Sequence, residues 1–125
     1  MGEYRIMQTK DGGYAFSLYA GNHEIIGRSQ VYKSMESLKN GIESVRKNAD
    51  SAIEDQTLDG FEKVPCPKWE IFLDEAGEYR FRLKAANGGI VLAASQGYTR
   101  KQSALKGIES VRRNKDSQMV KKDQE

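Results

Sequence analysis

The sequence uses one phrase twice, Gly-Ile-Glu-Ser-Val-Arg, at residues 41–46 and again at residues 107–112. Matching residues surround both copies, because Tyr14, Phe16, Leu18, Ala20 and Asn22 recur as Tyr79, Phe81, Leu83, Ala85 and Asn87. A unit of about fifty residues buries too little apolar surface to be secure alone, whereas two units can share one sheet and one helical layer. We therefore expect a single domain, residues 1–125, made of repeat 1 (1–55), a linker (56–68) and repeat 2 (69–121).

Both repeats predict the same order of elements. In repeat 1, strands are expected at 4–8, 14–20 and 24–29, a helix at 34–48 and a short strand at 51–55. The helix follows from Leu38, Ile42 and Val45, which form one apolar stripe, and Ser34 is its expected N-cap. In repeat 2, strands are expected at 69–73, 79–85, 90–95 and 117–121, with a helix at 100–114.

Two local signals in repeat 2 make sharper predictions. Thr99 and Gln102 have the spacing of a capping box at the start of the second helix. Asn87-Gly88 is the strongest short hairpin signal in the chain and predicts a type I′ turn. His23 stands at the matching position of repeat 1, where we expect a solvated turn residue.

Composition argues against several classes of function. The formal net charge is only +2, whereas a dedicated nucleic-acid binder usually shows a strong basic excess. The single cysteine, Cys66, and the single histidine, His23, cannot together build an ordinary Cys/His metal site. The sequence shows no signal peptide and no apolar run of membrane-spanning length. We expect a cytoplasmic protein with no cofactor and no membrane partner.

Three spaced motifs, each present twice, resemble those of the YegP-like family. They are Tyr-x-Phe-x-Leu-x-Ala-x-Asn, then Ser-Gln-x-Tyr, then Gly-Ile-Glu-Ser-Val-Arg. That family comprises small bacterial and archaeal proteins of unknown function with one or two copies of a short domain. The resemblance implies an α+β fold in which two β-β-β-α-β units form one antiparallel sheet, with two helices on one face and the last strand of each unit crossing to the other. It also implies a monomer with an internal pseudo-two-fold axis, and it supplies no catalytic residue.

A basic stripe is the first candidate for partner binding. Arg80, Arg82 and Lys84 alternate with apolar residues and share the sheet face away from the helices, where an open sheet can bind single-stranded nucleic acid. We favour an internal explanation, in which Phe72 lies opposite Arg80 and Glu70 lies opposite Arg82. Those contacts would be a cation–π pair and an ion pair, and only Lys84 would then lack a partner in that hairpin.

A stripe of small residues on each helix is the second candidate. Gly41 and Gly107 stand in helix interiors, where glycine costs about 1 kcal/mol relative to alanine. One explanation is a groove for a ligand or partner, lined also by Ser37, Ser44 and Asn48 and by their counterparts in repeat 2. The explanation we favour is close packing of the helix against its neighbours. Beside the stripe, the Glu43–Arg46 and Glu109–Arg112 pairs are expected to be exposed ion pairs.

No catalytic constellation stands out, so we expect a small non-enzymatic binding or interaction module. Its partner is unknown, and another protein is the first expectation. A weak nucleic-acid binder that uses the open sheet face is the alternative, and an enzyme with an unrecognised polar pocket ranks third.

Overall fold

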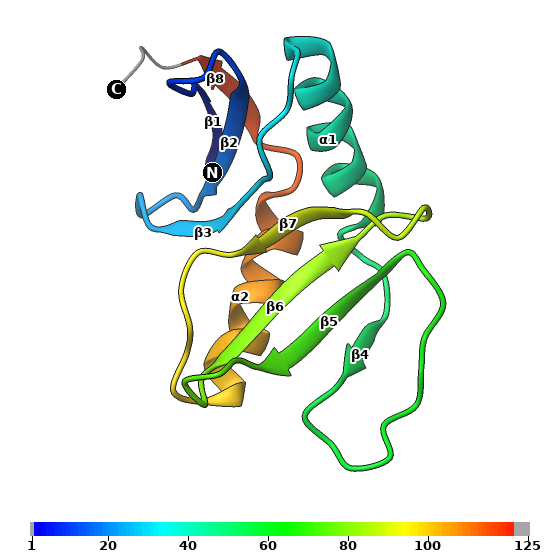
Figure 1. Ribbon diagram of the computed structural model, residues 1–125. Coiled ribbons are helices and arrows are strands. Elements are labelled where there is room, and N and C mark those ends of the chain that lie inside the picture. Colours follow the sequence, from blue (N-terminus) through cyan, green and yellow to red (C-terminus); the bar gives the residue numbers. More distant parts are fainter. Residues whose placement is uncertain (1, 122–125) are drawn as a thin grey trace.

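The computed structural model describes residues 2–121 as one run of five elements that occurs twice (Figure 1). The first run comprises β1 (Glu3–Gln8), β2 (Tyr14–Tyr19), β3 (Ile25–Arg28), α1 (Met35–Asn48) and β4 (Ile53–Asp55). The second comprises β5 (Lys68–Leu73), β6 (Tyr79–Lys84), β7 (Ile90–Ala94), α2 (Lys101–Asn114) and β8 (Gln118–Lys121). The predicted α+β class and the predicted order of elements are confirmed.

All eight strands belong to one sheet, in the order β4-β5-β6-β7-β3-β2-β1-β8. The hairpin neighbours and the central β3·β7 pair are antiparallel, as predicted. The outermost pairs, β4 with β5 and β8 with β1, are parallel, so the expectation of a wholly antiparallel sheet was wrong. Parallel neighbours need a long crossover, and the linker after β4 takes the chain back to the start of β5.

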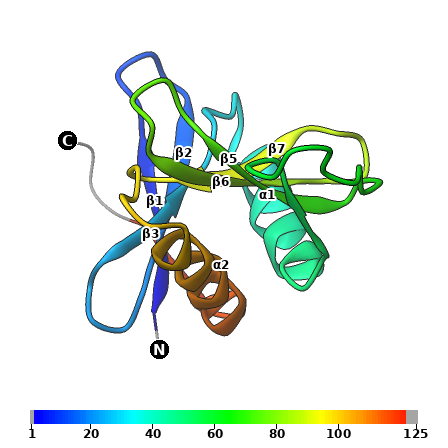
Figure 2. The same cartoon turned by 90° about the horizontal axis from the view of Figure 1, so that it is seen from below.

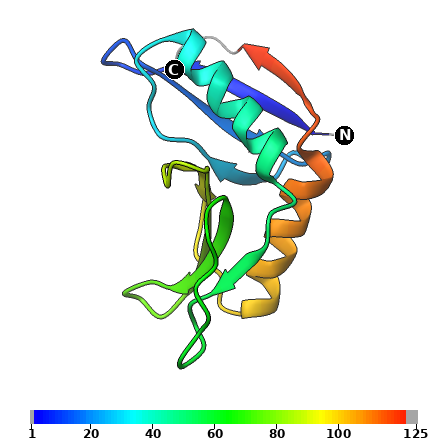
Figure 3. The same cartoon turned by 90° about the vertical axis from the view of Figure 1, so that its right-hand side faces the viewer.

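The two halves of the sheet meet over a short contact. Only Gly27 with Ala94 and Arg28 with Ala93 pair between β3 and β7, and Figure 3 shows the two groups of strands diverging from this point. A Cβ on Gly27 would lie 2.9 Å from the Leu92 side chain, so this crossing requires a residue without one. Each half is completed by the last strand of the other run.

The apolar stripes of both helices face the sheet. Figure 2 shows α1 and α2 on the same side of it, and the stripe residues are fully buried: Leu38, Ile42, Val45, Ala104, Ile108 and Val111. Ser34 caps α1 as predicted, since its side chain accepts a hydrogen bond from the Ser37 N–H. The predicted capping box of α2 was wrong, because Arg100 occupies the N-cap and no side chain caps that helix.

The arginine at the end of each Gly-Ile-Glu-Ser-Val-Arg segment binds the opposite repeat. The Arg46 guanidinium reaches from α1 to repeat 2, donating to the main-chain oxygens of Lys115 (3.3 Å) and Ser117 (2.7 Å). Arg112 donates to the equivalent oxygens of repeat 1, those of Ala49 (2.9 Å) and Ser51 (2.8 Å). A glutamate three residues earlier pairs with each arginine, as predicted. The pairs are therefore part of a clamp between repeats, which the sequence alone did not reveal.

The hairpin turns of the two repeats share one conformation. The Ala20 N–H donates to Glu24 and the Ala85 N–H donates to Gly89 across the turns. His23 and Gly88 hold the left-handed position, with φ of 71° and 83°. A type I′ turn needs positive φ at two central residues, so the predicted turn type was wrong. No helix within residues 2–121 is long and apolar enough to span a lipid bilayer.

Candidate functional site

The basic stripe lies on the sheet face turned away from the helices, which we term the outer face. The predicted register is confirmed, since Phe72 is opposite Arg80 and Glu70 is opposite Arg82. Arg82 pairs with Glu70 and also supplies the cation–π contact, its guanidinium lying 4.3 Å from the Phe72 ring centre. Arg80 instead pairs with Asp74 at 2.8 Å.

Lys84 also has a partner, contrary to expectation. Its Nζ lies 3.2 Å from the Glu70 carboxylate. All three cations of the stripe are therefore paired within the protein. Their predicted role in partner binding stays a prediction, and a partner would have to compete with these carboxylates.

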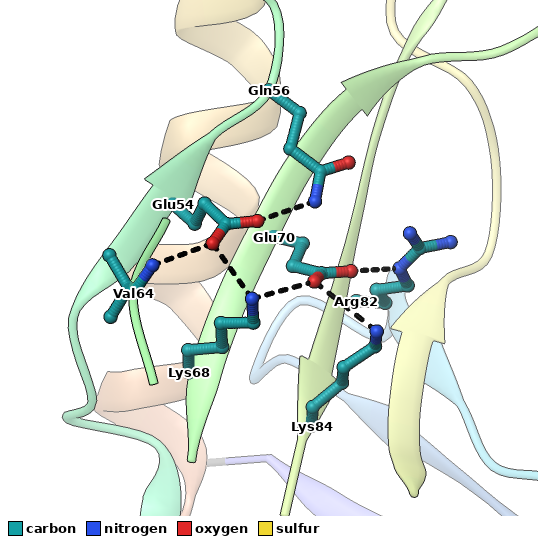
Figure 4. Close-up of polar contacts among 7 residues, drawn as sticks. All are labelled: Glu54, Gln56, Val64, Lys68, Glu70, Arg82 and Lys84. Carbon is teal, nitrogen blue, oxygen red and sulfur yellow. Dashed lines mark hydrogen bonds and ion pairs between the residues drawn. The ribbon is translucent and has the colours of Figure 1, made fainter. Parts of the chain in front are cut away.

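A buried charged cluster underlies the stripe (Figure 4). Its centre is formed by Glu54 and Glu70, each 2% exposed, with Lys68 between them at 2.7 Å and 3.1 Å. Glu54 also accepts hydrogen bonds from the Gln56 amide (2.6 Å) and from the main-chain N–H of Val64 (2.7 Å). Because Val64 belongs to the linker, the cluster fixes the linker to the sheet.

The protonation of the cluster follows from these contacts. The pKa of Glu54 is lowered to about 2, first by the hydrogen bond from Lys68 and then by those from Gln56 and Val64. Burial raises the pKa of Glu70, but its three cationic neighbours outweigh burial and the net direction is downward. The contact with Glu54 in turn raises the pKa of Lys68. Both carboxyls are thus held ionised and hydrogen-bonded, which suits a structural anchor and not a general base at neutral pH.

The helix glycines lie against aromatic rings. A Cβ on Gly41 would lie 2.2 Å from the Tyr32 hydroxyl oxygen, and one on Gly107 would lie 2.7 Å from the Phe81 ring. Close packing, the explanation favoured from the sequence, therefore accounts for both glycines. Their role in binding a partner remains a prediction.

Two grooves nevertheless run beside the small-residue stripes. The α2 groove, of about 450 Å³, lies between α2 and the β2–β3 turn, and its polar lining includes Asn22, Glu24, Ser103, Lys106 and Ser110. The α1 groove, of about 600 Å³, lies between α1 and the β6–β7 turn, and its polar lining includes Asn40, Ser44, Lys47, Asn48 and Asn87.

The grooves occupy equivalent places in the two repeats. Asn22 matches Asn87, and Ser110 matches Ser44, so each groove combines the helix of one repeat with the turn of the other. The sequence showed these polar residues recurring, and we read them as turn and packing positions. The sequence could not show that these residues meet, because each helix lies beside the turn of the other repeat.

The described chain offers little for metal chemistry. Within residues 2–121, no group of three or more His, Cys, Asp or Glu side chains is placed to hold a metal ion. Cys66 is half-buried in the linker, and the exposed His23 lies with its Nδ1 3.5 Å from Arg5.

A family model described as "Domain of unknown function (DUF1508)" matches the chain twice, at residues 9–55 and 74–121. A UPF0339 protein of Acinetobacter baylyi is 40% identical over 120 residues, which are 96% of this chain and 95% of that protein. A UPF0339 protein of Methanosarcina acetivorans is 55% identical over 47 residues, which are 38% of this chain and 79% of that protein. A match of that length is slightly shorter than one repeat.

Solved structures agree with these sequence matches. The solution structure of YegP from E. coli, a protein of unknown function, has a TM-score of 0.80 to this chain at 32% identity. The alignment covers 98% of this chain and 93% of YegP. The predicted resemblance is therefore confirmed: the chain belongs to the DUF1508 family and is similar to UPF0339 proteins, among them YegP.

Proposed function

We propose that the protein is a non-enzymatic binding module whose ligands occupy the α1 and α2 grooves. The observation that carries this proposal is the equivalence of the two grooves. Each groove combines the helix of one repeat with the turn of the other, so both depend on the way the repeats are joined.

The proposal includes a finer account of the fold. Residues 1–55 and 69–121 are two copies of a β-β-β-α-β unit, with both helices on one face and the final strands exchanged. The exchange places each helix above the other copy's turn, which creates the two grooves. The pairing of β4 with β5 and of β8 with β1 supports this account.

The absence of enzymatic activity is part of the proposal. The carboxylates Glu54 and Glu70 are occupied by cations and hydrogen bonds, and neither has the raised pKa expected of a general acid or base at neutral pH. Neither carboxylate lines the α1 or the α2 groove. The grooves themselves offer amide, hydroxyl, lysine and glutamate side chains, the glutamates being Glu24 in the α2 groove and Glu43 in the α1 groove, and these groups suit recognition by hydrogen bonds.

The test is a fragment screen by two-dimensional amide NMR on the full chain. We expect polar fragments to shift the amide signals of groove residues such as Ser44 and Asn87, or Ser110 and Asn22. Ser44→Leu should block the first groove only, and Ser110→Leu the second only, so each variant is the control for the other. Hits that map only to the outer face would contradict the proposal.

A second candidate, nucleic-acid binding on the outer face, is favoured by one observation. Cross-strand pairing sets Arg82, Ala93, Arg28, Ser17 and Arg5 in a single row across the sheet. Arg28 is exposed and has no ion-pair partner among residues 2–121. Arginines on alternate strands are about 10 Å apart, and the residues between them are small.

This candidate ranks second because arginines of the row already cover the aromatic rings that lie beside it. The Arg5 guanidinium lies 3.7 Å from the Tyr19 ring centre, and Arg82 lies similarly over Phe72. Bases that stack on proteins need such ring faces free. Fluorescence anisotropy with labelled single-stranded and double-stranded oligonucleotides tests the candidate. Affinity that falls with salt and falls for Arg28→Ala would support it, and no binding at low salt would eliminate it.

A further inference from the structure

The α2 groove carries an acidic side chain on one wall and a basic side chain on the other. Glu24 belongs to the β2–β3 turn, and Lys106 belongs to α2. Both side chains are exposed, and neither makes an ion pair with any residue in the range 2–121. The two charges therefore line one groove without pairing with each other.

The carboxylate of Glu24 is held in place by Asn22. Asn22 Nδ2 donates to Glu24 Oε1 at 2.8 Å, and Asn22 Oδ1 accepts the main-chain N–H of Glu24 at 3.1 Å. The second carboxylate oxygen, Oε2, accepts no hydrogen bond from residues 2–121. A group that is already held in one orientation loses less conformational freedom when a ligand binds. The turn thus presents a prepared acceptor to the groove.

The α1 groove lacks this arrangement. Gly89 stands at the position of Glu24, so Asn87 keeps the hydrogen bond from the main-chain N–H (2.9 Å) but has no carboxylate to hold. The glutamate that does line the α1 groove, Glu43, is engaged by Arg46 at 2.5 Å. The unpaired carboxylate is therefore a property of the α2 groove and not of the repeated unit.

The α2 groove also offers apolar surface. Its lining includes Ala20, Ile25 and Tyr98, and its volume of about 450 Å³ lies within the range of ligand sites. A ligand with two charged ends and an apolar group can use all of these features.

A carboxylate and an ammonium group on facing walls complement a small zwitterion, whereas a ligand with a single charge would leave one of them without a partner. We infer that the α2 groove binds a free amino acid with an apolar side chain. Its ammonium group contacts Glu24 and its carboxylate contacts Lys106. The inference rests on the proposed function and names the ligand class of one groove.

A second cation lies near Glu24. A neighbouring hollow of about 320 Å³ shares Glu24, Ile25 and Gln96 with the α2 groove and adds Arg28. The apolar surface of Tyr98 lines the α2 groove but not this hollow. We therefore assign the ligand carboxylate to Lys106 and use Arg28 to check the assignment.

The test is a titration of the full chain with L-leucine, followed by two-dimensional amide NMR. Two analogues each lack one charge: isocaproate has no ammonium group, and isoamylamine has no carboxylate. We expect leucine to shift the amide signals of Gln96, Lys106 and Ser110, and to bind more tightly than either analogue.

Substitutions then separate the two charges. Glu24→Gln should weaken leucine and isoamylamine about fivefold, the effect of one exposed charge pair, and should not weaken isocaproate. Lys106→Gln should weaken leucine and isocaproate to the same degree and should not weaken isoamylamine. Arg28→Gln should leave the affinity for leucine unchanged. Glu36→Gln and Lys39→Gln are the matched controls, because both side chains are exposed on α1 and neither lines the α2 groove.

Several outcomes would overturn the inference. Equal affinity for leucine and its analogues would show that the groove does not recognise both charges. Unchanged leucine binding by Glu24→Gln, or a loss with Arg28→Gln in place of Lys106→Gln, would remove the assigned contacts. If a variant does not fold, the comparison of leucine with its analogues on the wild type still decides the question.

An absence of any shift with leucine would also overturn the inference, and the fragment screen then separates it from the proposed function. Polar fragments that reach either groove would leave the proposed function standing without the amino acid. If no fragment reaches either groove, both fail.

Discussion

The two repeats are alike in the contacts that join them and differ on the outer face of the sheet. Arg46 and Arg112 make the same pair of contacts with the opposite repeat. On the outer face, β4 sets Glu54 beside Glu70, whereas β8 sets Val120 beside Arg5 at the equivalent place. The buried charged cluster therefore belongs to the edge that the linker covers and is not part of the repeated unit. The contacts that join the repeats are therefore common to both, whereas the charged cluster is found at one edge of the sheet.

Removal of Glu70 should have the largest effect. Glu70→Ala would leave Lys68, Arg82 and Lys84 without their shared carboxylate, and we expect a loss of about 3 kcal/mol in the free energy of unfolding. Urea unfolding followed by circular dichroism measures this loss. The matched control is Arg5→Ala at the equivalent position of β1, whose partly exposed side chain predicts a much smaller change. Equal losses at the two positions would contradict the assignment of the cluster to one edge.

The cluster also predicts how stability depends on pH. The pKa of Glu54 is about 2 in the folded protein and near 4.5 ordinarily, so the folded state favours the ionised form. Its contribution is fully present above about pH 4.5 and is lost as the pH falls toward 2. Unfolding curves across this range should show the wild type losing stability more steeply than Glu54→Gln. Parallel pH profiles for the two proteins would show that Glu54 is not held ionised.

The arginine clamps should respond alike, because their contacts are equivalent. Arg46→Ala and Arg112→Ala each remove two hydrogen bonds to main-chain oxygens, and we expect each to lower the free energy of unfolding by about 2 kcal/mol. Chemical unfolding of both single variants and of the double variant measures the effect. The two losses should add, since the clamps share no partner. A neutral substitution at either position would break the equivalence of the two halves.

The asparagines at the helix ends should respond differently. Asn114→Ala removes the acceptor for the Gly2 N–H, and we expect a loss of about 1 kcal/mol. Asn48→Ala removes an oxygen that accepts nothing within the described chain, so its cost should be smaller. Thermal unfolding of the two variants in the absence of any ligand makes the comparison. A larger loss for Asn48→Ala would show that its oxygen has a partner in the free protein.

Much of the fold could be predicted from the sequence because its helices and strands are determined by local patterns of apolar residues. The apolar stripe at Leu38, Ile42 and Val45 gave the helix, and the recurring Tyr-x-Phe-x-Leu gave the matching strands. The direction of β4 and β8 could not be predicted, because it depends on which distant strand each one joins. The capping box failed for a local reason, since α2 begins one residue later and places Arg100 at the cap.

The candidate site was harder to predict, because it depends on contacts between repeats. Pairing along the β5–β6 hairpin was predictable from register, and Glu70 with Arg82 was found there. Glu54 and Lys68 come from opposite ends of the linker, and only the parallel β4·β5 pairing brings them together.

The smallest predicted effect concerns the two hairpin turns, where His23 and Gly88 hold the same left-handed conformation. Such a backbone strains any residue with a Cβ, so His23→Gly should stabilise the fold by about 1 kcal/mol or less. Gly88→Ala is the mirror control and should destabilise it to a similar degree. The variants are compared by thermal unfolding in one buffer, and the side-chain contact that His23→Gly removes is the 3.5 Å approach of His23 Nδ1 to Arg5. If His23→Gly lowers the melting temperature, that exposed contact outweighs the backbone strain, and the two turns differ in what stabilises them.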